Sequence, residues 1–389
     1  MAHVVKLEKN LERVLRQGHP WVYRDALSGD LPEAGQVVDL LDGEGAFLAR
    51  GLSESGPIGL RVWTLVDEDL DGALMARRVA SAASLRERIL PGETSAYRFL
   101  HGEGDRMPGV VCDIYGEYAV LRFDGNSVAA WREIIRDAVW PVLKQKGVHH
   151  LLLRAGPRGQ QTVEALVGDK PKEMQWVTEH GMRMPVDLLQ GQKTGLFLDH
   201  RESRRRLRDL VRGQRVLNLY GYTGGFSVSA GLGGARQVCT VDRARGACDL
   251  ADVAWEANGL DPADHESHAE SVQVFLEKSD KGGEPYGVIV SDPPSFAPSQ
   301  DKRNAALQAY RALHRSALSR LEPGGLYLAA SCSSHVGRQD FDKTLLDGAR
   351  QAGKVLQVLE RWGAPADHPR LAAFPEGDYL KVILTRLLA

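Results

Sequence analysis

Apolar and polar positions are spaced differently in three parts of the chain, and each part predicts a different kind of structure. Residues 1 to about 72 hold short apolar runs separated by turn residues such as Asp42 and Gly43. This pattern predicts a small β-rich domain with a short helix over 7–16 and strands at 37–41, 46–52 and 58–65.

Residues 71–90 carry apolar side chains at helical spacing, and the Pro91-Gly92 pair ends the predicted helix. After this helix in the sequence, the pattern predicts a second helix over 128–146 and short strands at 97–100, 110–114, 118–123, 151–154 and 162–166. Strands and helices mixed in so short a stretch indicate a small α+β domain over 73–178.

From residue 179 onward, predicted strands and helices alternate. The strands are expected at 216–220, 237–241, 287–290 and 326–330, and the helices at 226–231, 244–258 and 304–321. Such alternation is typical of a parallel, doubly wound α/β sheet, so residues 179–389 are expected to form one Rossmann-like domain.

Composition excludes several classes of protein. Among 389 residues, 43% are hydrophobic and 26% charged, so a disordered chain is excluded. No apolar run reaches the roughly 18 residues of a membrane helix, and the N-terminus lacks a secretory core, which together predict a cytoplasmic protein. The four cysteines are widely spaced and form no C-x-x-C pair, so neither a disulfide framework nor a metal site is expected. A net charge of −2 gives no general support for a nucleic-acid partner.

A glycine turn at 221–225 lies between a predicted strand and a predicted helix, where open α/β sheets bind their ligands. Asp242 closes the next strand, a position from which a carboxylate can accept hydrogen bonds from ribose hydroxyls. The turn reads G-x-x-G-G instead of the dinucleotide pattern G-x-G-x-x-G. An adenosine-containing ligand without a pyrophosphate, such as S-adenosylmethionine, therefore fits better than NAD.

Two further strand ends carry candidate chemistry. Asp292 is followed by two prolines and Phe296, which predicts a stiff loop able to face a planar base, with Phe296 stacked on it. The competing interpretation is a Pro-rich turn with Phe296 in the core. Cys332 follows the strand at 326–330 among small serines that would let a substrate approach, although a buried, inert thiol is the alternative. Cys112, Cys239 and Cys248 lie inside predicted elements and are expected to be core residues.

Seven strings of the sequence resemble motifs of the bacterial large-subunit ribosomal RNA (cytosine-C5) methyltransferases, which are class I S-adenosylmethionine-dependent enzymes. They are GHPWVY (18–23), GEGDRMPG (102–109), GQKTGLFLDHR (191–201), VLNLYGYTGGF (216–226), DPPSF (292–296), SCS (331–333) and FPEGDYLK (374–381). The resemblance covers essentially the whole chain. It implies an N-terminal PUA-like RNA-binding β-barrel over 1–72, a central α+β domain and a methyltransferase domain.

The resemblance also implies a role for individual residues. Asp242 would hold the ribose of S-adenosylmethionine, Glu270 would face the adenine amine where relatives usually carry Asp, and Asp292 would lie between cofactor and target base. Cys332 would be the nucleophile. The full implied cofactor set is Gln192, Lys193, Thr194, Phe197, Arg201, Asn218, Tyr222, Thr223, Gly224, Asp242, Glu270 and Asp292, with no metal ion.

Cytosine C5 is a poor nucleophile, so its methylation requires covalent catalysis. A Cys332 thiolate that adds at C6 makes C5 electron-rich enough to take the methyl group. Asp292 in its acid form would protonate N3 during the addition. Glu376, Asp292 or a water would then remove the C5 proton, and the sequence leaves this choice open.

Large-subunit ribosomal RNA is the expected partner. A mixture of aromatic and basic residues near the N-terminus is typical of RNA binders, although an exposed helix end beside a core tryptophan would look the same. This candidate set is Arg13, Arg16, His19, Trp21 and Arg24. The arginine-rich stretch 201–215 is equally compatible with an RNA contact or a solvated helix face.

Two rival functions stay open at this point. Asp-Pro-Pro loops also serve methylation of exocyclic amines, at guanine N2 or adenine N6, which needs no cysteine. A non-catalytic RNA-binding ribosome assembly factor would keep the same fold. The oligomeric state, a homodimer included, is left open.

Overall fold

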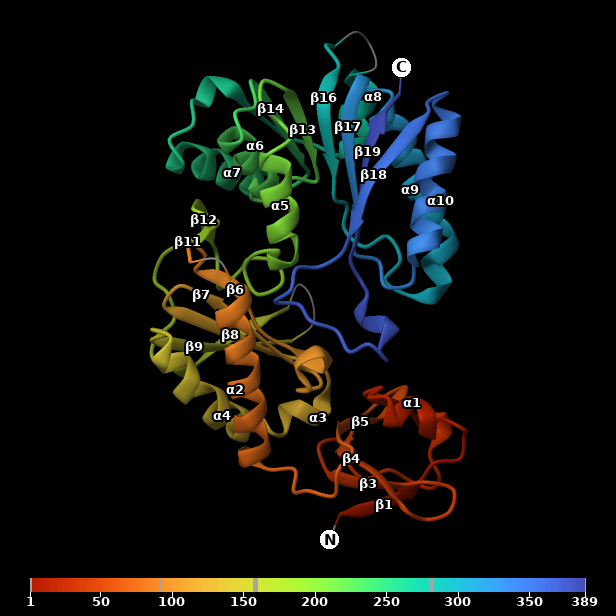
Figure 1. Ribbon diagram of the computed structural model, residues 1–389. Helices are drawn as coiled ribbons and strands as arrows, with labels where there is room; N and C mark the ends of the chain where they lie inside the picture. Colours follow the sequence, from red (N-terminus) through yellow and green to blue (C-terminus); the bar gives the residue numbers. More distant parts are fainter. Residues whose placement is uncertain (1, 91, 157–159, 280–282, 389) are drawn as a thin grey trace. The chain divides into compact units, whose positions relative to one another are not determined.

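The computed structural model describes residues 2–90, 92–156, 160–279 and 283–388. These divide into two compact units. The first unit consists of Met1–Val177, Val186–Leu198 and Ala366–Gly377, and the second of Thr178–Pro185, Asp199–Pro365 and Asp378–Ala389. Each unit is described by itself (Figure 1).

The N-terminal part of the first unit is a five-stranded sheet with the order β1-β3-β4-β5-β2. Its elements are β1 (His3–Lys6), α1 (Glu12–Arg16), β2 (Trp21–Tyr23), β3 (Val37–Leu41), β4 (Phe47–Ser53) and β5 (Ile58–Thr64). The two edge strands approach each other, because Leu7 forms a bridge to Leu27 and Ser28 N donates to Lys6 O. The sheet therefore curls into the predicted barrel. The helix predicted over 7–16 is shorter than expected, since β1 and the bridge take its first residues.

Glycine at one position of this barrel is required by a close backbone approach. A Cβ at Gly51 of β4 would lie 2.1 Å from the carbonyl oxygen of Arg61 on β5, which no side chain tolerates. The Arg61 guanidinium is itself buried and pairs with Glu54 and Glu103. A buried arginine of this kind is stable only because two carboxylates compensate its charge.

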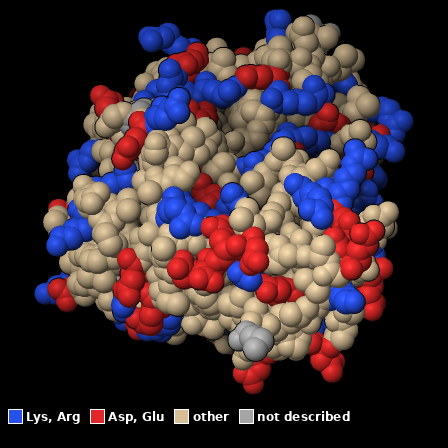
Figure 2. Space-filling view, turned by 60° about the horizontal axis from the view of Figure 1, so that its bottom comes forward, with Lys and Arg blue, Asp and Glu red and all other residues tan. Residues whose placement is uncertain are grey.

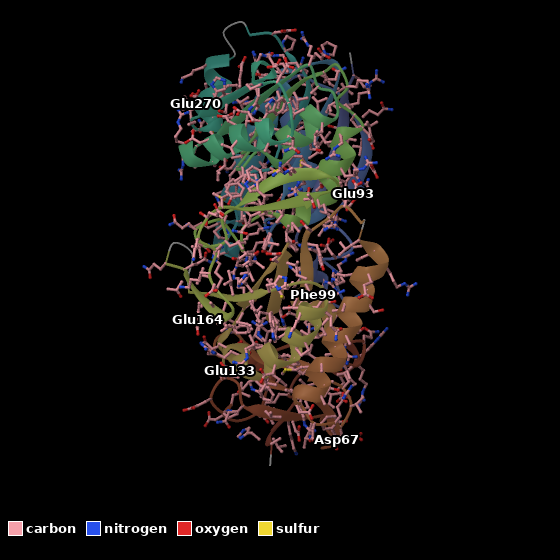
Figure 3. All side chains as sticks on the ribbon, turned by 90° about the vertical axis from the view of Figure 1, so that its left-hand side faces the viewer. Asp67, Glu93, Phe99, Glu133, Glu164 and Glu270 are labelled. Atoms are coloured by element: carbon pink, nitrogen blue, oxygen red, sulfur yellow. The ribbon has the colours of Figure 1, made fainter. Side chains whose placement is uncertain are left out.

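The rest of the first unit is a second five-stranded sheet, with the order β10-β9-β8-β7-β6, covered by two packed helices. Its elements are α2 (Gly72–Ile89), β6 (Ala96–His101), β7 (Val110–Tyr115), β8 (Tyr118–Phe123), α3 (Asn126–Ala129), α4 (Arg132–Gln145), β9 (His150–Ala155) and β10 (Thr162–Val167). Asp71 caps α2 by accepting a hydrogen bond from Leu74 N, as expected for a helix that starts there. Phe99 of β6, labelled in Figure 3, is fully buried in this core.

A two-stranded sheet of β11 (Gln175–Glu179) and β12 (Met182–Val186) precedes the large sheet of the second unit. The large sheet has seven strands in the order β15-β14-β13-β16-β17-β19-β18. The strands are β13 (Arg215–Leu219), β14 (Gln237–Asp242), β15 (His265–Ala269), β16 (Tyr286–Ser291), β17 (Leu321–Ser331), β18 (Leu356–Trp362) and β19 (Lys381–Leu387).

Helices cover both faces of the large sheet (Figure 1). One face packs against α5 (Arg201–Arg208), α6 (Gly225–Leu232) and α7 (Arg245–Ala257), through Leu207, Phe226 and Trp255. The other packs against α8 (Val272–Ser279), α9 (Arg303–Leu318) and α10 (Arg338–Gln351), through Phe275, Tyr310 and Phe341. The doubly wound prediction is therefore confirmed for this unit.

The expectation of a purely parallel sheet is wrong at one side. Strands β13 to β17 are parallel, but β19 runs antiparallel to both of its neighbours, β17 and β18. Six of the seven side chains of β19 are buried, all except Arg386, so this strand is an interior one. An antiparallel neighbour needs no crossover helix, which is why the α/β alternation of the sequence did not reveal it.

The cysteines follow the prediction from the sequence. Cys112, Cys239 and Cys248 are buried, and Cys332 is half-exposed. Within the described ranges, no helix combines the length and the apolar character needed to cross a bilayer.

Candidate functional site

Four neighbouring parallel strands of the second unit end at one edge of the sheet. The register pairs Leu219 with both Val241 and Ser291, and Ser291 in turn with Ala329. The residues just beyond these positions therefore meet at the same edge, which is the ligand edge of open α/β sheets. The glycine turn, Asp242, Asp292 and Cys332 all follow this edge, as predicted.

The glycine turn after β13 is tightly held by the protein itself. Tyr220 and Tyr222 both adopt left-handed backbone conformations, with φ of 60° and 47°. Such a conformation is unfavourable for a tyrosine and is kept only where the surroundings enforce it. Here Asp242 Oδ2 accepts a hydrogen bond from Tyr222 N at 3.0 Å, and Gly221 N donates to Val241 O.

The glycines of this turn are required by close packing inside the protein. A Cβ at Gly221 would lie 2.5 Å from Thr240 Cγ2, and a Cβ at Gly224 would lie 2.6 Å from Ala251 Cβ. These glycines let the turn pack on β14 and α7. Close approach of a ligand is therefore not needed to explain them.

Beneath the turn, Asn218 is fully buried and donates from Nδ2 to Ser227 Oγ at 2.8 Å. Its Oδ1 atom is buried as well, and no donor in the described part of the chain reaches it. Thr223 is also buried, and Tyr222 is half-buried. A ligand that carries N–H or O–H donors, as an amino acid or a ribose does, would satisfy the orphaned oxygen.

The next strand end brings two carboxylates to adjacent strands. Asp242 is the last residue of β14 and pairs in register with Ala269, the last residue of β15. Glu270 is the next residue after β15, so the two carboxylates lie at neighbouring strand ends. Glu270, labelled in Figure 3, lies 2.7 Å from Lys278 Nζ and is about one quarter exposed. Its predicted contact with an adenine amine would share the carboxylate with this lysine, and that role stays a prediction.

Asp292 has a partner that the sequence did not single out. His200 Nε2 lies 3.2 Å from Asp292 Oδ2, and the His200 side chain is 3% exposed. The His200 ring also packs edge-on against Phe226, with 5.4 Å between the ring centroids. His200 stands inside the string GQKTGLFLDHR, so the signal was present, but the string did not say which side chain reaches Asp292.

Cys332 and the Asp292 loop are joined through one serine. Ser333 Oγ accepts from Phe296 N at 3.1 Å and lies 3.2 Å from Ser295 Oγ. It also lies 2.9 Å from the Tyr310 hydroxyl, which lies at the same distance from Ser331 Oγ. Ser331 and Ser333 are fully buried and Ser334 is exposed, so the expectation that small serines let a substrate approach is wrong for the first two. They fix the loop that carries Cys332.

Phe296 behaves as the competing interpretation expected. Its ring lies 4.8 Å from that of Tyr310 and packs against the core under α9. Stacking on a target base is therefore not the contact that the structure gives this residue.

Lys381 is a further residue of this edge to which the sequence assigned no role. It pairs in register with Ser331, and its Nζ donates to Ser333 O at 2.7 Å and to Tyr379 O at 2.8 Å. Its side chain is 2% exposed. Burial lowers the pKa of Lys381 to about 8, while the nearby Cys332 and Asp378 act in the opposite direction.

Four of the predicted cofactor residues, Gln192, Lys193, Thr194 and Phe197, belong to the first unit. Thr194 is buried, and its hydroxyl donates to Asp113 Oδ2 at 2.5 Å. Lys193 Nζ lies 4.4 Å from the centre of the Phe197 ring. The Thr194 contact alone explains a threonine at this position, and the cofactor roles of the four stay predictions.

The arginine-rich stretch is largely neutralised inside the second unit. Arg201 is buried beside Glu202 at 3.1 Å, and Arg204 makes a two-pronged contact with Glu179 at 2.5 and 2.6 Å. The remaining pairs include Arg205 with Asp209 and Arg206 with Glu360. Packing accounts for these arginines better than an RNA contact does.

The predicted RNA-binding cluster divides into two groups. Trp21 donates from Nε1 to Glu103 at 2.8 Å and packs edge-on against Phe374, while His19 lies 3.4 Å from Glu376. These two aromatic rings therefore serve contacts within the first unit. Glu376, predicted as a base, also belongs to that unit, whereas Cys332 and Asp292 belong to the second.

Arg13, Arg16 and Arg24 are exposed on the barrel. Arg24 and the exposed Tyr23 line a hollow of about 670 Å³. Its other walls are Lys9, Leu11, Asp25, Ala26, Gly56 and Pro57. Figure 2 shows basic side chains interspersed with acidic ones over the face in view, in keeping with the near-neutral charge of the chain.

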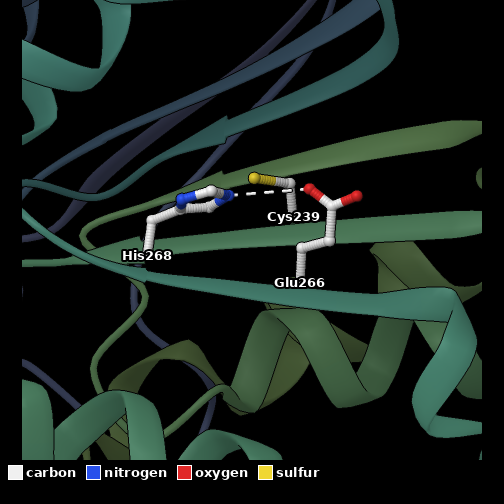
Figure 4. A group of neighbouring side chains, drawn as sticks. All are labelled: Cys239, Glu266 and His268. Atoms are coloured by element: carbon white, nitrogen blue, oxygen red, sulfur yellow. Dashed lines mark ion pairs between the residues drawn. The ribbon is translucent and has the colours of Figure 1, made fainter.

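One group of potential metal ligands exists among the described residues, away from the strand ends. Cys239 of β14 and Glu266 and His268 of β15 bring their ligand atoms within 4.8 Å of one another (Figure 4). Burial raises the pKa of Cys239 to about 12, and Glu266 accepts from Gln237 at 2.8 Å. A protonated thiol is a poor metal ligand, so these contacts read as packing on the sheet.

Comparisons with known proteins bear out the fold. A profile of the family described as S-adenosylmethionine-dependent methyltransferase matches residues 127–386, and one described as PUA-like domain matches residues 5–65. Ribosomal RNA large subunit methyltransferase I of Klebsiella pneumoniae is 35% identical over 390 residues, which cover 98% of each chain.

Two solved structures share the architecture of nearly the whole chain. A SAM-dependent methyltransferase from Streptococcus mutans has a TM-score of 0.87 at 24% identity, covering 99% of this chain and all of its own. A methyltransferase solved with S-adenosylhomocysteine has the same TM-score and coverage at 25% identity. The similarity extends through both units.

Proposed function

Because the chain belongs to the S-adenosylmethionine-dependent methyltransferases, in the family of ribosomal RNA large subunit methyltransferase I, we propose that it methylates cytosine C5 in 23S ribosomal RNA. The cofactor is S-adenosylmethionine, which supplies a methyl group on an electrophilic sulfonium. The observation that carries the choice of C5 is the half-exposed Cys332 at the strand edge that also holds Asp292.

The cofactor would lie across the ends of β13 and β14. Asp242 offers its carboxylate to the ribose while it holds the turn through Tyr222 N. The orphaned Asn218 oxygen gives a further acceptor beside that turn. Glu270 on the next strand is the proposed partner of the adenine amine.

Cys332 begins the reaction as a thiolate. Its sulfur forms a bond to C6 of cytosine, the electron pair of the C5–C6 double bond moves to C4–C5, and the pair of the C4–N3 double bond moves to N3, which takes a proton from the acid form of Asp292. C5 would then accept the methyl group, whose bond to the sulfonium sulfur breaks to leave S-adenosylhomocysteine. When a base removes the proton from C5, the double bond forms again and the S–C6 bond breaks, which returns the thiolate.

Asp292 is proposed to steady the ring nitrogen N3 during the addition. With Oδ2 near His200 Nε2, the carboxyl group has one oxygen fixed by the protein and one that can face the base. The proton on C5 would pass to Asp292, to a water or to Glu376. Of these three, Asp292 belongs to the same unit as Cys332.

We expect three domains to take part in substrate binding: the barrel over 1–72, the central domain over 73–178 and the methyltransferase domain over 179–389. The barrel would hold RNA through exposed basic side chains, with Arg13, Arg16 and Arg24 as the proposed contacts. The target cytosine must leave its stack to reach Cys332, which favours a single-stranded or flipped nucleotide.

Cys332→Ala tests the chemistry. The variant should lose methylation of 23S ribosomal RNA while it still binds S-adenosylhomocysteine. RNA with 5-fluorocytosine should trap the wild-type protein, because fluorine at C5 cannot leave as a proton. The trapped adduct should migrate slowly on a denaturing gel and be absent from the alanine variant.

Cys112→Ala, which removes a buried thiol from the first unit, is the matched control and should form the adduct normally. Methylation of an exocyclic amine requires no bond between enzyme and base. An active Cys332→Ala variant without an adduct would therefore transfer the assignment to guanine N2 or adenine N6. No methylation of any RNA by the wild-type protein would favour an assembly factor.

A further inference from the structure

Lys381 is a buried ammonium group whose nearest partners carry no charge. Its Nζ donates to two backbone carbonyls, those of Ser333 and Tyr379, and its side chain is 2% exposed. Lys381 takes part in none of the ion pairs among the described residues, and the nearby Asp378 is paired with Arg338 instead. A buried charge without a counter-ion is costly, so its presence calls for a charge that it stabilises.

The position of Lys381 points to Cys332 as that charge. Lys381 starts β19 directly opposite Ser331, the residue before Cys332. Its Nζ then reaches the carbonyl of Ser333, the residue after Cys332. Lys381 therefore contacts the residues on either side of Cys332 in the chain. A negative charge on Cys332 raises the pKa of Lys381, against the larger, lowering effect of burial.

The other titratable groups around Lys381 and Cys332 either have a partner of their own or carry no charge. Asp378 is held in a two-pronged contact by Arg338, at 2.6 and 2.7 Å. Tyr310, on α9, stays protonated because burial raises its pKa to about 12. On the Asp292 loop, the carboxyl group has His200 as its partner.

We propose that the Lys381 ammonium is the positive charge that stabilises the Cys332 thiolate before it attacks the base. This inference rests on the proposed role of Cys332 as the nucleophile. Lys381 is a positioning residue, because it acts through Cys332. Its two hydrogen bonds to carbonyl oxygens fix the ammonium in place, and the proposal requires its third N–H to face the sulfur.

The stabilisation of the Cys332 thiolate should depend on pH, because only the protonated form of Lys381 carries a positive charge. The thiolate form gains from a protonated Lys381, and burial lowers the pKa of this lysine to about 8. The stabilisation is therefore present at neutral pH and is lost as the ammonium loses its proton in alkaline solution.

Alkylation of Cys332 by iodoacetamide, followed from pH 5 to 10 on the intact protein, measures the thiolate directly. Mass analysis of the peptide that contains Cys332 separates it from the three buried cysteines. The wild-type midpoint should lie below the roughly 8.5 of an ordinary thiol. In Lys381→Gln, which keeps a hydrogen-bond donor but no charge, it should rise by about one pH unit, or about tenfold slower alkylation at pH 7.

Lys381→Arg separates charge from structure, because it restores the charge and should return the midpoint toward the wild-type value. Lys343→Gln, an exposed lysine on α10, is the matched control and should not move it. Equal midpoints in wild type and Lys381→Gln would overturn the proposal. A wild-type midpoint at or above 8.5 would overturn it as well, even if neither Lys381 variant folds.

Alkylation requires neither RNA nor cofactor, so its outcome is independent of the proposed methylation. If 5-fluorocytosine RNA forms an adduct but Lys381→Gln does not move the midpoint, the role of Lys381 is refuted and the C5 mechanism stands. If the midpoint moves but no adduct forms, Lys381 does stabilise the thiolate and the C5 mechanism is refuted.

Discussion

His200 Nε2 lies 3.2 Å from Asp292 Oδ2, inside a site where the histidine is almost completely buried. The contact holds one carboxyl oxygen, and the other is the one proposed to face the target base. Removing this partner should therefore disturb the chemistry more than the binding of the cofactor.

His200→Gln should lower the methylation rate by about tenfold or more, because a hydrogen bond to a charged group is worth about 1.5–3 kcal/mol. The affinity for S-adenosylhomocysteine, measured by calorimetry, should change little. His149→Gln, at an exposed position of the first unit, is the control. An unchanged rate in His200→Gln would show that Asp292 needs no orientation by this histidine.

Asp242 has two tasks that a pair of substitutions can separate. Asp242→Ala should weaken binding of S-adenosylhomocysteine by about tenfold or more, because a charge-assisted acceptor for the ribose is lost. Asp242→Asn keeps one oxygen acceptor for Tyr222 N and should bind more tightly than the alanine variant. Calorimetry gives both affinities, with Asp249→Ala on α7 as the control. Wild-type affinity in Asp242→Ala would refute the ribose contact.

Tyr310→Phe removes the hydroxyl that joins Ser331 and Ser333. We expect the free energy of unfolding to fall by about 1–2 kcal/mol, because two buried serine hydroxyls lose a shared partner. Urea denaturation measures the change. Tyr118→Phe, at a half-buried ring in the first unit, should change stability by less than about 0.5 kcal/mol. Equal effects of the two substitutions would contradict a network at the Cys332 loop.

His314 should make the second unit sensitive to acid. Burial lowers the pKa of His314 to about 3, from 6.5 in the unfolded chain. Between these values the unfolded state binds more protons, so stability falls as the pH falls through this window, by about 1.4 kcal/mol per pH unit. Denaturation at pH 7 and pH 5 should show a smaller loss for His314→Gln than for the wild type. The same loss in both would contradict this source of acid sensitivity.

Arg13 and Arg16 lie exposed on the barrel, Arg16 with Asp42 at 3.6 Å, and are the proposed phosphate contacts. Replacing both by Gln should weaken RNA binding and reduce the slope of log affinity against log salt by about one for each contact. Filter binding at several salt concentrations measures the slope, and Arg88→Gln on α2 is the control. An unchanged slope would remove the two arginines from the interface.

The sequence predicted the site better where chemistry follows a strand end than where it depends on packing. Asp242, Asp292 and Cys332 could be placed because each follows an apolar run, and parallel strands bring such positions to one edge. His200 and Lys381 could not, because a contact between residues about 90 or 50 positions apart depends on how the chain folds back.

Local patterns also misled where a polar residue has more than one use. Trp21 and His19 resemble an RNA-binding cluster in composition, yet their polar atoms contact Glu103 and Glu376. The arginines after residue 200 resemble a basic patch, yet Arg204 is neutralised by Glu179. Burial and partner choice decide both cases, and neither is written in the spacing of residues.

The antiparallel direction of β19 has a consequence for how the enzyme is made. The strand enters the sheet at the edge where the parallel strands end, so its first residue, Lys381, arrives beside Cys332. It also lies between β17 and β18 in the sheet. A nascent chain interrupted before β19 would carry Cys332 without the ammonium proposed to stabilise its thiolate, and β17 and β18 would lose the strand that lies between them. We therefore expect such a truncated product to be inactive by the proposed mechanism.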